Sequence, residues 1–514
     1  MPEQQLIALL DALEGLISCS NPQCLTDDIF IHSIIIDSRK VQAGSLFVAL
    51  KGALVDGHRY VQTAIEKGAA AILVEQSELE SFKDCNVPVL VALNTRAVLG
   101  NLAKAFFNSP LDKFRAVIGI TGTNGKTTCS YIAESLLLSA KLSVGVIGTI
   151  NYRWTNPKTG HQVVLDAPNT TPESLVLYEL AHRMIEDGVE ILVMEVSSHG
   201  LETHRLVGVE FDGAMFTNLT QDHLDFHGSM ESYEQAKRKL FFEHLKPESI
   251  SVLNVHDRVG RKWFDSLCAQ RDPSRVVGYS AHAAVDGVDS PWIAASLQSS
   301  LEGVEVTLGN AQQLHIPLVG QFNVANVLGV LAMIQAMDLI DEEQLHQSVQ
   351  GITGVPGRLQ RVNPGNMPAV FVDYAHTPDA LEHVLETLQP FCDGELWCVF
   401  GCGGDRDKGK RPQMGAIAVA HADKVMVTSD NPRREPPMQI VEDILAGVES
   451  GSSQQSVLVE LDRALAIRAA IIDAGPEDVV LIAGKGHENY QELATGRIDF
   501  CDVEQSEKSI KLRG

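Results

Sequence analysis

Residues 116–128 of the 514-residue chain read AVIGITGTNGKTT and carry its strongest local signal for secondary structure and fold class. An apolar run at residues 116–120 leads into a glycine-rich loop at residues 122–128, and a helical pattern follows over residues 127–140. A loop between a strand and a helix presents backbone amides to phosphates, and the helix dipole favours their negative charge. The stretch therefore predicts a phosphate loop within an α/β sheet.

The composition of this loop favours ATP with Mg²⁺ as the ligand. Its residues are Gly122, Thr123, Asn124, Gly125, Lys126, Thr127 and Thr128. Lys126 can reach the terminal phosphates, and the hydroxyl of Thr127 suits Mg²⁺. The common pattern G-x-x-x-x-G-K-[ST] places glycine at position 120, where this chain has Ile120, so the match is one position short. A glycine-rich turn before a helix is the alternative, but GKTT at a strand–helix junction favours the phosphate loop.

The length, composition and charge exclude several classes of protein. A chain of 514 residues, 45% hydrophobic and 21% charged, suits two to four globular domains. Its formal net charge of −25 argues against nucleic acid as a partner and against docking on an anionic membrane. The N-terminus lacks a basic leader segment, and no apolar run approaches the ~20 residues that span a bilayer. We therefore expect a cytoplasmic protein without membrane insertion. We also expect a monomer.

The nine cysteines do not form a zinc-binding pattern. We expect them to be reduced and mostly buried.

Turn signals divide the chain into three predicted domains. The break Asn108-Ser109-Pro110 and the turn residues at 353–357 place them at residues 1–109, 110–353 and 354–514. The predicted strands cover residues 47–50, 71–74, 89–92, 144–147, 191–195, 213–217 and 251–254, and the predicted helices cover 95–107 and 323–337. This alternation predicts an α/β fold, with a small N-terminal α/β domain before the mostly parallel sheet that carries the phosphate loop.

The last domain carries four apolar runs that are each followed at once by glycine and charged residues. The runs are 370–372, 396–400, 425–427 and 479–482, and the segments after them read DYAHTPDAL, GCGGDRDKGKR, SDNPRREPP and AGKGHE. Ligands bind beyond the carboxyl ends of the strands in open α/β sheets. The pattern predicts a Rossmann-like domain with a composite polar site.

Two further segments carry groups that suit a metal ion. Glu195 ends the apolar run 191–195, where a carboxylate near a phosphate loop suits Mg²⁺, although a surface glutamate is the alternative. His223 and His227 lie four residues apart in TNLTQDHLDFHG, residues 217–228. The residue after His223 is Leu224, so the segment is not the His-Glu-x-x-His of a zinc protease. One of the two histidines can be structural.

Lys237 lies on an apolar helix face. Ser232 and Gln235 fit a capping box, which places Lys237 in the first turns of a helix together with Tyr233 and Phe241 on one face. From this pattern alone, the lysine is expected to extend its ammonium to solvent.

In the C-terminal segment, Arg433 and Arg434 lie on a proline-stiffened loop and offer planar groups suited to a carboxylate. Glu488 follows in the glycine-rich AGKGHE, where it can hold an ammonium group. A rigid surface turn is the alternative for the arginine loop, and a solvated loop is the alternative for the charged residues 405–411.

Taken together, these motifs resemble the Mur ligases of bacterial cell-wall synthesis. GTNGKTT, MEVSSHGL, TNLTQDHLDFHG, DYAHTPDAL, GDRDKGKRP, DNPR and AGKGHE occur in the order of that family and span essentially the whole chain. The resemblance implies an ATP- and Mg²⁺-dependent ligase that joins meso-2,6-diaminopimelate to UDP-N-acetylmuramoyl-L-alanyl-D-glutamate through an acyl phosphate. DNPR is similar to the version that adds diaminopimelate, since lysine-adding relatives typically lack the arginine.

The resemblance also implies roles for particular residues. Lys126, Glu195, His223 and Lys237 would be catalytic; Thr127, Glu195 and His223 would hold Mg²⁺, and Lys237 would be carbamylated and support a second Mg²⁺. Asn323, Asn326, Arg358 and His376 would contact the nucleotide. Ser38, Asn169, Thr170, Thr171, Ser197 and Arg205 would bind the UDP substrate, the first of them in an N-terminal UDP-substrate domain. Arg406, Asp430, Asn431, Pro432, Arg433, Gly484 and Glu488 would bind the diamino acid. One departure is Thr203, where the family often has glutamine.

Three other functions fit parts of the pattern. A folylpolyglutamate-synthase-like ligase shares the central domain, but the segments Asp37-Ser38-Arg39 and DNPR argue against it. A regulatory nucleotide-binding protein would lack Lys126, Glu195, His223 or Lys237, all of which are present. A transport or motor ATPase is disfavoured because the chain has neither a basic face nor a repeat.

Overall fold

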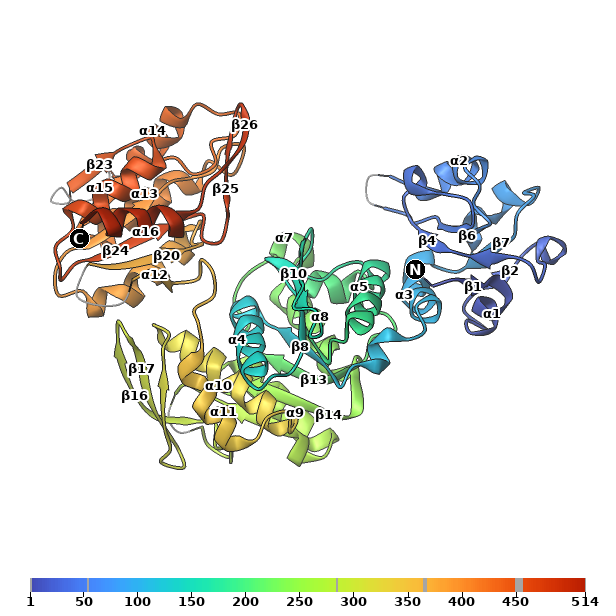
Figure 1. Cartoon of the computed structure of the whole chain (residues 1–514), viewed down its shortest axis with the longest axis horizontal. Helices are drawn as coiled ribbons and strands as arrows, with labels where there is room; N and C mark the ends of the chain where they lie inside the picture. Colours follow the sequence, from blue (N-terminus) through green and yellow to red (C-terminus); the bar gives the residue numbers. More distant parts are fainter. Residues whose placement is uncertain (1, 53–54, 283–284, 364–367, 449–455, 514) are drawn as a thin grey trace. The chain divides into compact units, whose positions relative to one another are not determined.

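The computed structural model describes residues 2–52, 55–282, 285–363, 368–448 and 456–513 (Figure 1). Contacts divide the chain into two compact units. The first unit comprises Met1–Tyr279 and Gly329–Asp341, and the second comprises Ser280–Leu328 and Glu342–Gly514. The predicted domain boundaries at residues 109 and 353 stay predictions.

The N-terminal segment is built on a five-stranded sheet of order β2-β7-β6-β5-β4. Its elements are β1 (Gln4–Gln5), α1 (Leu6–Asp11), β2 (Ser18–Cys19), β3 (Phe30–Ile31), β4 (Ser33–Ile35), β5 (Ser45–Val48), α2 (Val61–Glu66), β6 (Ala71–Glu75), β7 (Val89–Ala92) and α3 (Thr95–Phe106). Strands β4 to β7 are parallel, and β2 runs antiparallel to β7. The strands predicted here and the helix over residues 95–107 are present within one or two residues.

The phosphate-loop segment forms an eight-stranded sheet of order β11-β10-β9-β12-β8-β13-β14-β15. Its strands are β8 (Ala116–Thr121), β9 (Val144–Ile147), β10 (Asn151–Thr155), β11 (Gln162–Asp166), β12 (Ile191–Glu195), β13 (Phe211–Phe216), β14 (Leu245–Asn254) and β15 (Val276–Tyr279). Strands β8, β9 and β12 to β15 are parallel, and every residue of β8 and β12 is buried. The expected mostly parallel sheet is confirmed, and the antiparallel pair β10–β11 at its edge was not predicted.

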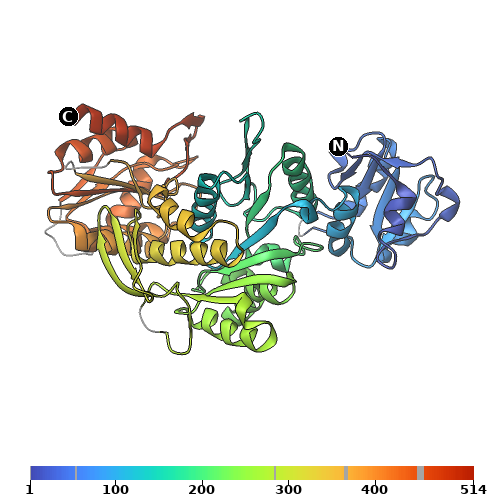
Figure 2. The ribbon, with the colours of Figure 1, turned by 60° about the horizontal axis from the view of Figure 1, so that its bottom comes forward.

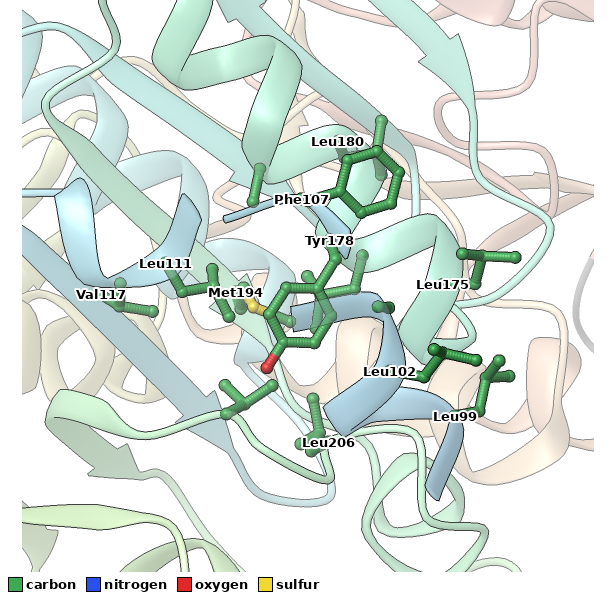
Figure 3. Packing of buried hydrophobic residues seen from close by; sticks show 14 of the residues in the cluster. Leu99, Leu102, Phe107, Leu111, Val117, Leu175, Tyr178, Leu180, Met194 and Leu206 are labelled. Atoms are coloured by element: carbon green, nitrogen blue, oxygen red, sulfur yellow. The ribbon is translucent and has the colours of Figure 1, made fainter. Parts of the chain in front are cut away.

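The helices of this segment are α4 (Lys126–Ser139), α5 (Ser174–Asp187), α6 (Ser198–Glu202), α7 (Leu224–His227), α8 (Met230–Phe242) and α9 (Arg258–Gln270). Helices α4, α8 and α9 pack against the sheet, α6 and α7 pack against α8, and α5 packs against α3. Figure 3 shows Tyr178 of α5 among Leu99 and Leu102 of α3 and Leu206, and all four belong to one buried cluster. The break after α3 is a local turn, in which Asn108 has a φ of 56°.

The second unit contains a small antiparallel sheet and a six-stranded sheet. The small sheet, which was not predicted, consists of β16 (Ala294–Ser300), β17 (Gly303–Leu308) and β18 (Gln313–Ile316). Helix α10 (Gln321–Ala336) begins in this unit and ends in the first, and α11 (Glu342–Ser348) follows. The six-stranded order is β19-β20-β24-β21-β22-β23.

The six-stranded sheet is covered by helices on both faces, as a Rossmann-like sheet requires (Figure 2). Its strands are β19 (Gln360–Arg361), β20 (Ala369–Asp373), β21 (Leu396–Phe400), β22 (Lys424–Val427), β23 (Ser456–Val459) and β24 (Val479–Ala483). Helices α12 (Pro378–Leu388), α13 (Lys410–His421) and α14 (Pro437–Val448) pack on one face, and α15 (Arg463–Asp473) and α16 (Asp502–Arg513) pack on the other. A hairpin of β25 (Tyr490–Leu493) and β26 (Gly496–Asp499) precedes α16.

All nine cysteines are free thiols, as expected. The expectation that most are buried is wrong, because only Cys129, Cys398 and Cys402 are buried and the other six are partly exposed. Among the described residues, no helix combines the length and the hydropathy needed to cross a membrane.

Candidate functional site

The phosphate loop connects the buried strand β8 to the first turn of α4. Gly122 has a φ of 150°, and Gly125, the N-cap of α4, has a φ of 87°. A Cβ atom on Gly122 would lie 1.8 Å from Oγ1 of Thr217. Glycine is therefore required at position 122 both by conformation and by space.

Hydrogen bonds to the segment that follows β13 fix the loop. The backbone amide of Thr123 donates to the carbonyl of Asn218 at 2.9 Å, and the amide of Asn124 donates to Oδ1 of Asn218 at 2.9 Å. Lys126 folds over the loop, and its ammonium donates to the carbonyls of Gly122 and Thr123 at 2.8 Å each. The ammonium of Lys126 therefore lies against the loop, at the place where the sequence predicts the terminal phosphates of ATP.

Glu195 ends strand β12, which pairs directly with β8, and it is only 1% exposed. One carboxylate oxygen accepts hydrogen bonds from Oγ1 of Thr127 and Oγ1 of Thr149, both at 2.8 Å. The other accepts from the amide of Thr149 at 3.1 Å and from Oγ of Ser130 at 3.4 Å. The surface-glutamate alternative is wrong, and the oxygen-rich surroundings form a donor set suited to Mg²⁺.

Lys237 lies well inside α8, because the helix begins at Met230 and its N-cap is Ser229. The predicted capping box at Ser232 is wrong: Ser229 accepts from the amide of Ser232, which already belongs to the helix. Lys237 is therefore not in the first turns.

The expectation from pattern alone that Lys237 reaches solvent is also wrong, since it is 1% exposed. Its ammonium donates to the carbonyl of Gly122 at 2.8 Å and lies 4.6 Å from the centre of the Tyr233 ring. Burial, with the charge of Lys126 nearby, holds the pKa of Lys237 well below its usual range. A lowered pKa favours the neutral amine, which is the form of lysine that reacts with carbon dioxide.

His223 and His227 differ in what surrounds them. His223 has a φ of 52°, and its Nε2 lies 3.4 Å from Oδ2 of Asp222. Its ring centre lies 6.1 Å from that of Tyr233, whose hydroxyl lies 3.2 Å from Oγ1 of Thr123 in the loop. His227 is joined through Nε2 to Oγ of Ser198 at 2.8 Å. The hydrogen bond of His227 therefore links α7 to α6, whereas His223 is half exposed near the phosphate loop.

The segment predicted to bind the UDP substrate adjoins Glu195. Oγ1 of Thr170 lies 3.0 Å from Oγ1 of Thr149, and Tyr152 donates to the carbonyl of Asn169 at 2.6 Å. Thr171 is buried and donates its hydroxyl to the carbonyl of Glu195 at 2.8 Å. The structure thus brings this segment to the predicted metal ligand.

Arg205 approaches the same segment. It donates to the carbonyl of Thr171 at 2.8 Å, and its Nε lies 3.2 Å from Glu173, which also binds Arg96 of α3 at 3.0 Å. Thr203, the departure from the family pattern, donates its hydroxyl to the carbonyl of His199 at 2.6 Å. Its hydroxyl is therefore committed within the helix.

Two more predicted residues lie at the starts of short helices. Ser197 is the N-cap of α6, and its Oγ accepts from the amide of Gly200 at 3.0 Å. Ser38 begins a short 3₁₀ helix, Ser38–Lys40, whose N-cap is Asp37.

The predicted nucleotide contacts outside the loop lie in the second unit. Asn323 and Asn326 are each 5% exposed on α10, and Asn323 donates to the carbonyl of Val319 at 2.8 Å. The guanidinium of Arg358 lies 5.0 Å from the centre of the Tyr374 ring. Nδ1 of His376 lies 2.8 Å from the carbonyl of Tyr374, so this tyrosine joins Arg358 and His376 in one cluster.

The four polar segments of the C-terminal domain meet at one edge of the sheet. Strands β20, β24, β21 and β22 are adjacent and parallel, so their carboxyl ends lie at the same edge, as predicted. Asp430 and Asn431 after β22 are 7% and 3% exposed. Burial raises the pKa of Asp430. Gly484 after β24 has a φ of 117°, and a Cβ there would lie 2.6 Å from Oδ2 of Asp430.

Arg433 is directed by contacts on both sides, so the alternative of a plain surface turn is wrong. Its φ is 51°, its Nε lies 3.1 Å from Oε2 of Glu492, and its Nη1 donates to the carbonyl of Gly404 at 2.8 Å. Arg434 is 86% exposed and pairs with Asp405 at 2.9 Å. Arg406 is exposed, and Pro432 lies buried between Asn431 and Arg433.

Sequence reasoning missed several residues that support these groups. They are Thr149, Ser130, Glu173, Arg463, Lys485, Glu492 and Asp502. Lys485 alone lay inside a quoted motif, AGKGHE, and its position between two glycines was the available signal. The others belong to no pattern that we singled out.

Comparison with known proteins places this geometry in a family. Models described as "Mur ligase family, catalytic domain", "Mur ligase middle domain" and "Mur ligase, glutamate ligase domain" match residues 30–107, 120–334 and 357–486.

Two curated relatives align with nearly the whole chain. The UDP-N-acetylmuramoyl-L-alanyl-D-glutamate--2,6-diaminopimelate ligase of Coxiella burnetii is 41% identical over 97% of this chain and 99% of the relative. The protein of the same name from Synechococcus elongatus is 42% identical over 96% of each chain. A solved structure with this name has a TM-score of 0.68 at 33% identity and covers 94% of this chain and 95% of its own.

A folylpolyglutamate synthase of Mycobacterium tuberculosis is similar at a TM-score of 0.56. At 17% identity, with 82% of this chain and 95% of that chain covered, it shares the fold alone.

Proposed function

This chain belongs to the Mur ligase family, and on that premise we propose that it is the ATP-dependent ligase that joins 2,6-diaminopimelate to UDP-N-acetylmuramoyl-L-alanyl-D-glutamate. The product is a precursor of peptidoglycan. The observation that carries the proposal is the hydrogen-bonded set of Thr127, Glu195 and Thr149 at the phosphate loop, joined to the predicted substrate segment through Thr170. This continuous set supports the proposal, because it would bring ATP on the loop close to the carboxylate that it activates.

The chemistry follows from the need to activate a carboxylate. The γ-carboxylate of the D-glutamyl residue attacks the γ-phosphorus of ATP, ADP leaves, and an acyl phosphate forms. The amine of diaminopimelate attacks the acyl carbon, loses a proton, and the tetrahedral intermediate expels phosphate to leave an amide. Lys126 and the loop amides stabilise the negative charge that develops on the transferred group.

Oxygen donors around Glu195 fit Mg²⁺, which prefers hard oxygen ligands. We assign its ligands as Thr127, Glu195 and His223, with a carbamylated Lys237 for a second ion. When bound, Mg²⁺ neutralises phosphate charge and orients the reacting oxygens. The burial of Lys237 and its lowered pKa support the carbamate, because burial favours the neutral amine that reacts with carbon dioxide, and the carbamate anion can then pair with a metal.

The substrate contacts are assigned by the same reasoning. Asn169, Thr170, Ser197 and Arg205 face the UDP-linked dipeptide in this proposal, with Thr171 acting as a support because its hydroxyl is committed to Glu195. Ser38 serves the uridine side, and Asn323, Asn326, Arg358 and His376 serve the nucleotide. Arg406, Asp430, Asn431, Pro432, Arg433, Gly484 and Glu488 serve the diamino acid.

Each of the three predicted domains receives one substrate. Residues 1–109 would bind the UDP substrate, residues 110–353 ATP, and residues 354–514 the amino acid. The partners are small molecules, and we propose a monomer acting in the cytoplasm, where nucleotides are available. The acidic charge of −25 supports the absence of nucleic acid as a partner.

The experiment measures ADP formation by the purified chain with ATP, Mg²⁺, UDP-N-acetylmuramoyl-L-alanyl-D-glutamate and meso-diaminopimelate, omitting each in turn. Glu195→Gln is compared with Glu190→Gln, an exposed residue just before β12. We expect ADP to require every component, and Glu195→Gln to lower kcat by about 10²-fold or more while Glu190→Gln does not. ADP release that ignores the UDP substrate would contradict the proposal.

A further inference from the structure

The buried ammonium of Lys485 lies in the middle of the group proposed to bind the diamino acid. The side chain of Lys485 is 0% exposed. Its Nζ donates to Oε2 of Glu488 at 2.8 Å and to Oδ1 of Asn431 at 3.0 Å. Both partners belong to the proposed amino-acid site, whereas Lys485 itself was assigned no part in it.

The turn around Lys485 directs its side chain inward. Gly484 and Gly486 flank it with φ values of 117° and 53°, in a region that side chains rarely adopt. A Cβ on Gly484 would meet Asp430, and a Cβ on Gly486 would meet Tyr374 at 2.7 Å. Glycine is therefore required on both sides of Lys485. Burying a charged lysine costs free energy unless the charge is paired. The two polar contacts of Lys485 supply that pairing.

Lys485 closes a ring of hydrogen bonds with its two partners. Nδ2 of Asn431 donates to Oε2 of Glu488 at 2.8 Å, and Oδ1 of Asn431 also accepts from the amide of Glu492 at 2.9 Å. Oε2 of Glu488 thus receives two donors. Among the residues that the structure describes, none donates a hydrogen bond to Oε1 of Glu488. Oε2 of Glu488 is therefore engaged by two protein donors, and Oε1 is available to accept a hydrogen bond from a ligand.

The charges around the ring have the sign that a zwitterion needs. Asp430, Glu488 and Glu492 are three carboxylates close together after β22 and β24, and Arg433 lies beside Glu492. Burial and the charge of Glu488 raise the pKa of Asp430, and the positive charges of Arg463 and Lys485 oppose that rise. An ammonium approaching Glu488 and a carboxylate approaching Arg433 would both be attracted.

We propose that Lys485 is a positioning residue of the amino-acid site, which fixes Glu488 and Asn431 so that Oε1 of Glu488 faces the ammonium of the incoming diamino acid. This inference rests on the proposed function. Loss of Lys485 frees Glu488 to rotate and removes one donor from Asn431, so binding of the amino acid weakens while the phosphate loop, which belongs to the other unit, keeps its own contacts.

The experiment compares Lys485→Met with Lys424→Met in the full chain. Lys424 lies at the opposite end of β22, is 30% exposed and pairs with Glu395 at 3.5 Å, so the same substitution there is the matched control. Steady-state ADP release gives KM for diaminopimelate and for ATP separately. We expect Lys485→Met to raise KM for diaminopimelate about 10- to 100-fold, the weight of one charge-assisted hydrogen bond, with KM for ATP changed less than about twofold.

Absence of diaminopimelate-dependent ADP release by the unsubstituted chain would count against the proposed function, not against Lys485 alone. Given an active parent chain, an unchanged or lowered KM for diaminopimelate in Lys485→Met overturns the inference. So does an equal rise in both KM values, which is what general loosening of the domain would give.

A thermal melt accompanies each variant. If Lys485→Met does not fold, Lys485→Ala is purified and assayed in ethylammonium chloride, with tetramethylammonium chloride at equal ionic strength as control. Ethylammonium can donate to Glu488 and Asn431 from the vacated space, whereas the quaternary ion cannot. Recovery of KM for diaminopimelate with ethylammonium alone supports the inference, and equal effects of the two salts overturn it.

Discussion

Replacement of Arg433 by alanine is the perturbation that separates amino-acid recognition from nucleotide chemistry. Two of the guanidinium contacts are already in use, since Nε lies 3.1 Å from Glu492 and Nη1 donates to the carbonyl of Gly404. A substrate carboxylate can therefore gain one full charge-assisted hydrogen bond and share a second. These bonds contribute about 2 to 4 kcal/mol to the binding free energy, which is less than two unshared bonds would give.

We expect Arg433→Ala to lower kcat/KM for diaminopimelate by about 30- to 1000-fold. The carboxylate of Glu492, left without its partner, adds repulsion toward the substrate carboxylate. KM for ATP should stay within about twofold, because Arg433 bonds to Glu492 and Gly404, neither of which is assigned to the nucleotide. The assay is ADP release with either substrate varied.

Arg434→Ala is the control, because Arg434 is the next residue, is 86% exposed and pairs with the surface residue Asp405. It should change kcat/KM by less than about twofold. Equal loss of diaminopimelate and ATP use in Arg433→Ala, or equal effects of the two alanine variants, would refute the assignment of Arg433 to the amino-acid carboxylate.

Three further outcomes test other parts of the structure. Thr149→Val removes one hydroxyl donor from Glu195 and should lower kcat about 10-fold with little change in KM for diaminopimelate; an unchanged kcat would show that Glu195 needs no such support. Asp502→Asn removes the charge partner of the fully buried Arg463 and should lower the free energy of unfolding by about 3 kcal/mol in urea titrations, and a loss below about 1 kcal/mol would contradict the pairing. Burial lowers the pKa of His487 to about 4, so its neutral form contributes stability above about pH 6.5 that is lost as pH falls toward 4. Between pH 7 and pH 5 the loss should be about 2 kcal/mol, and His487→Gln should remove that slope; a variant with the same slope would assign it to other groups.

The phosphate loop could be predicted because its signal is local. An apolar strand, two glycines and GKTT all lie within residues 116–128, so the strand, the loop and the start of the helix can be predicted from neighbouring residues. The ends of β20, β21, β22 and β24 were predictable for the same reason, since each apolar run is followed at once by its polar segment.

Burial of single polar side chains could not be predicted in this way. The helix face of Lys237 was correct, yet its exposure was wrong, because the carbonyl that it binds belongs to Gly122, 115 positions away. Thr149 is likewise defined by Glu195, 46 positions away. Such partners are chosen by the sheet order, which residue spacing does not reveal.

Prediction of secondary structure failed where a strand contains few apolar residues. Strand β16 is mostly exposed and reads AASLQSS, so it carries little of the alternation that marks a half-buried strand. The cap of α8 was misplaced by three residues because Ser229 and Ser232 both fit the start of a helix, and only the hydrogen bond from the amide of Ser232 distinguishes them.

The central claim is that ATP at residues 122–128 activates the D-glutamyl carboxylate for attack by diaminopimelate. The most direct measurement is phosphate release by the purified chain with ATP, Mg²⁺ and UDP-N-acetylmuramoyl-L-alanyl-D-glutamate, offered meso-diaminopimelate, L-lysine or L-ornithine, with the UDP-linked product identified by mass. We expect phosphate and a UDP-linked tripeptide with meso-diaminopimelate alone. Product with lysine and none with diaminopimelate would contradict the amino-acid assignment, and phosphate release without any UDP-linked product would contradict the ligase mechanism itself.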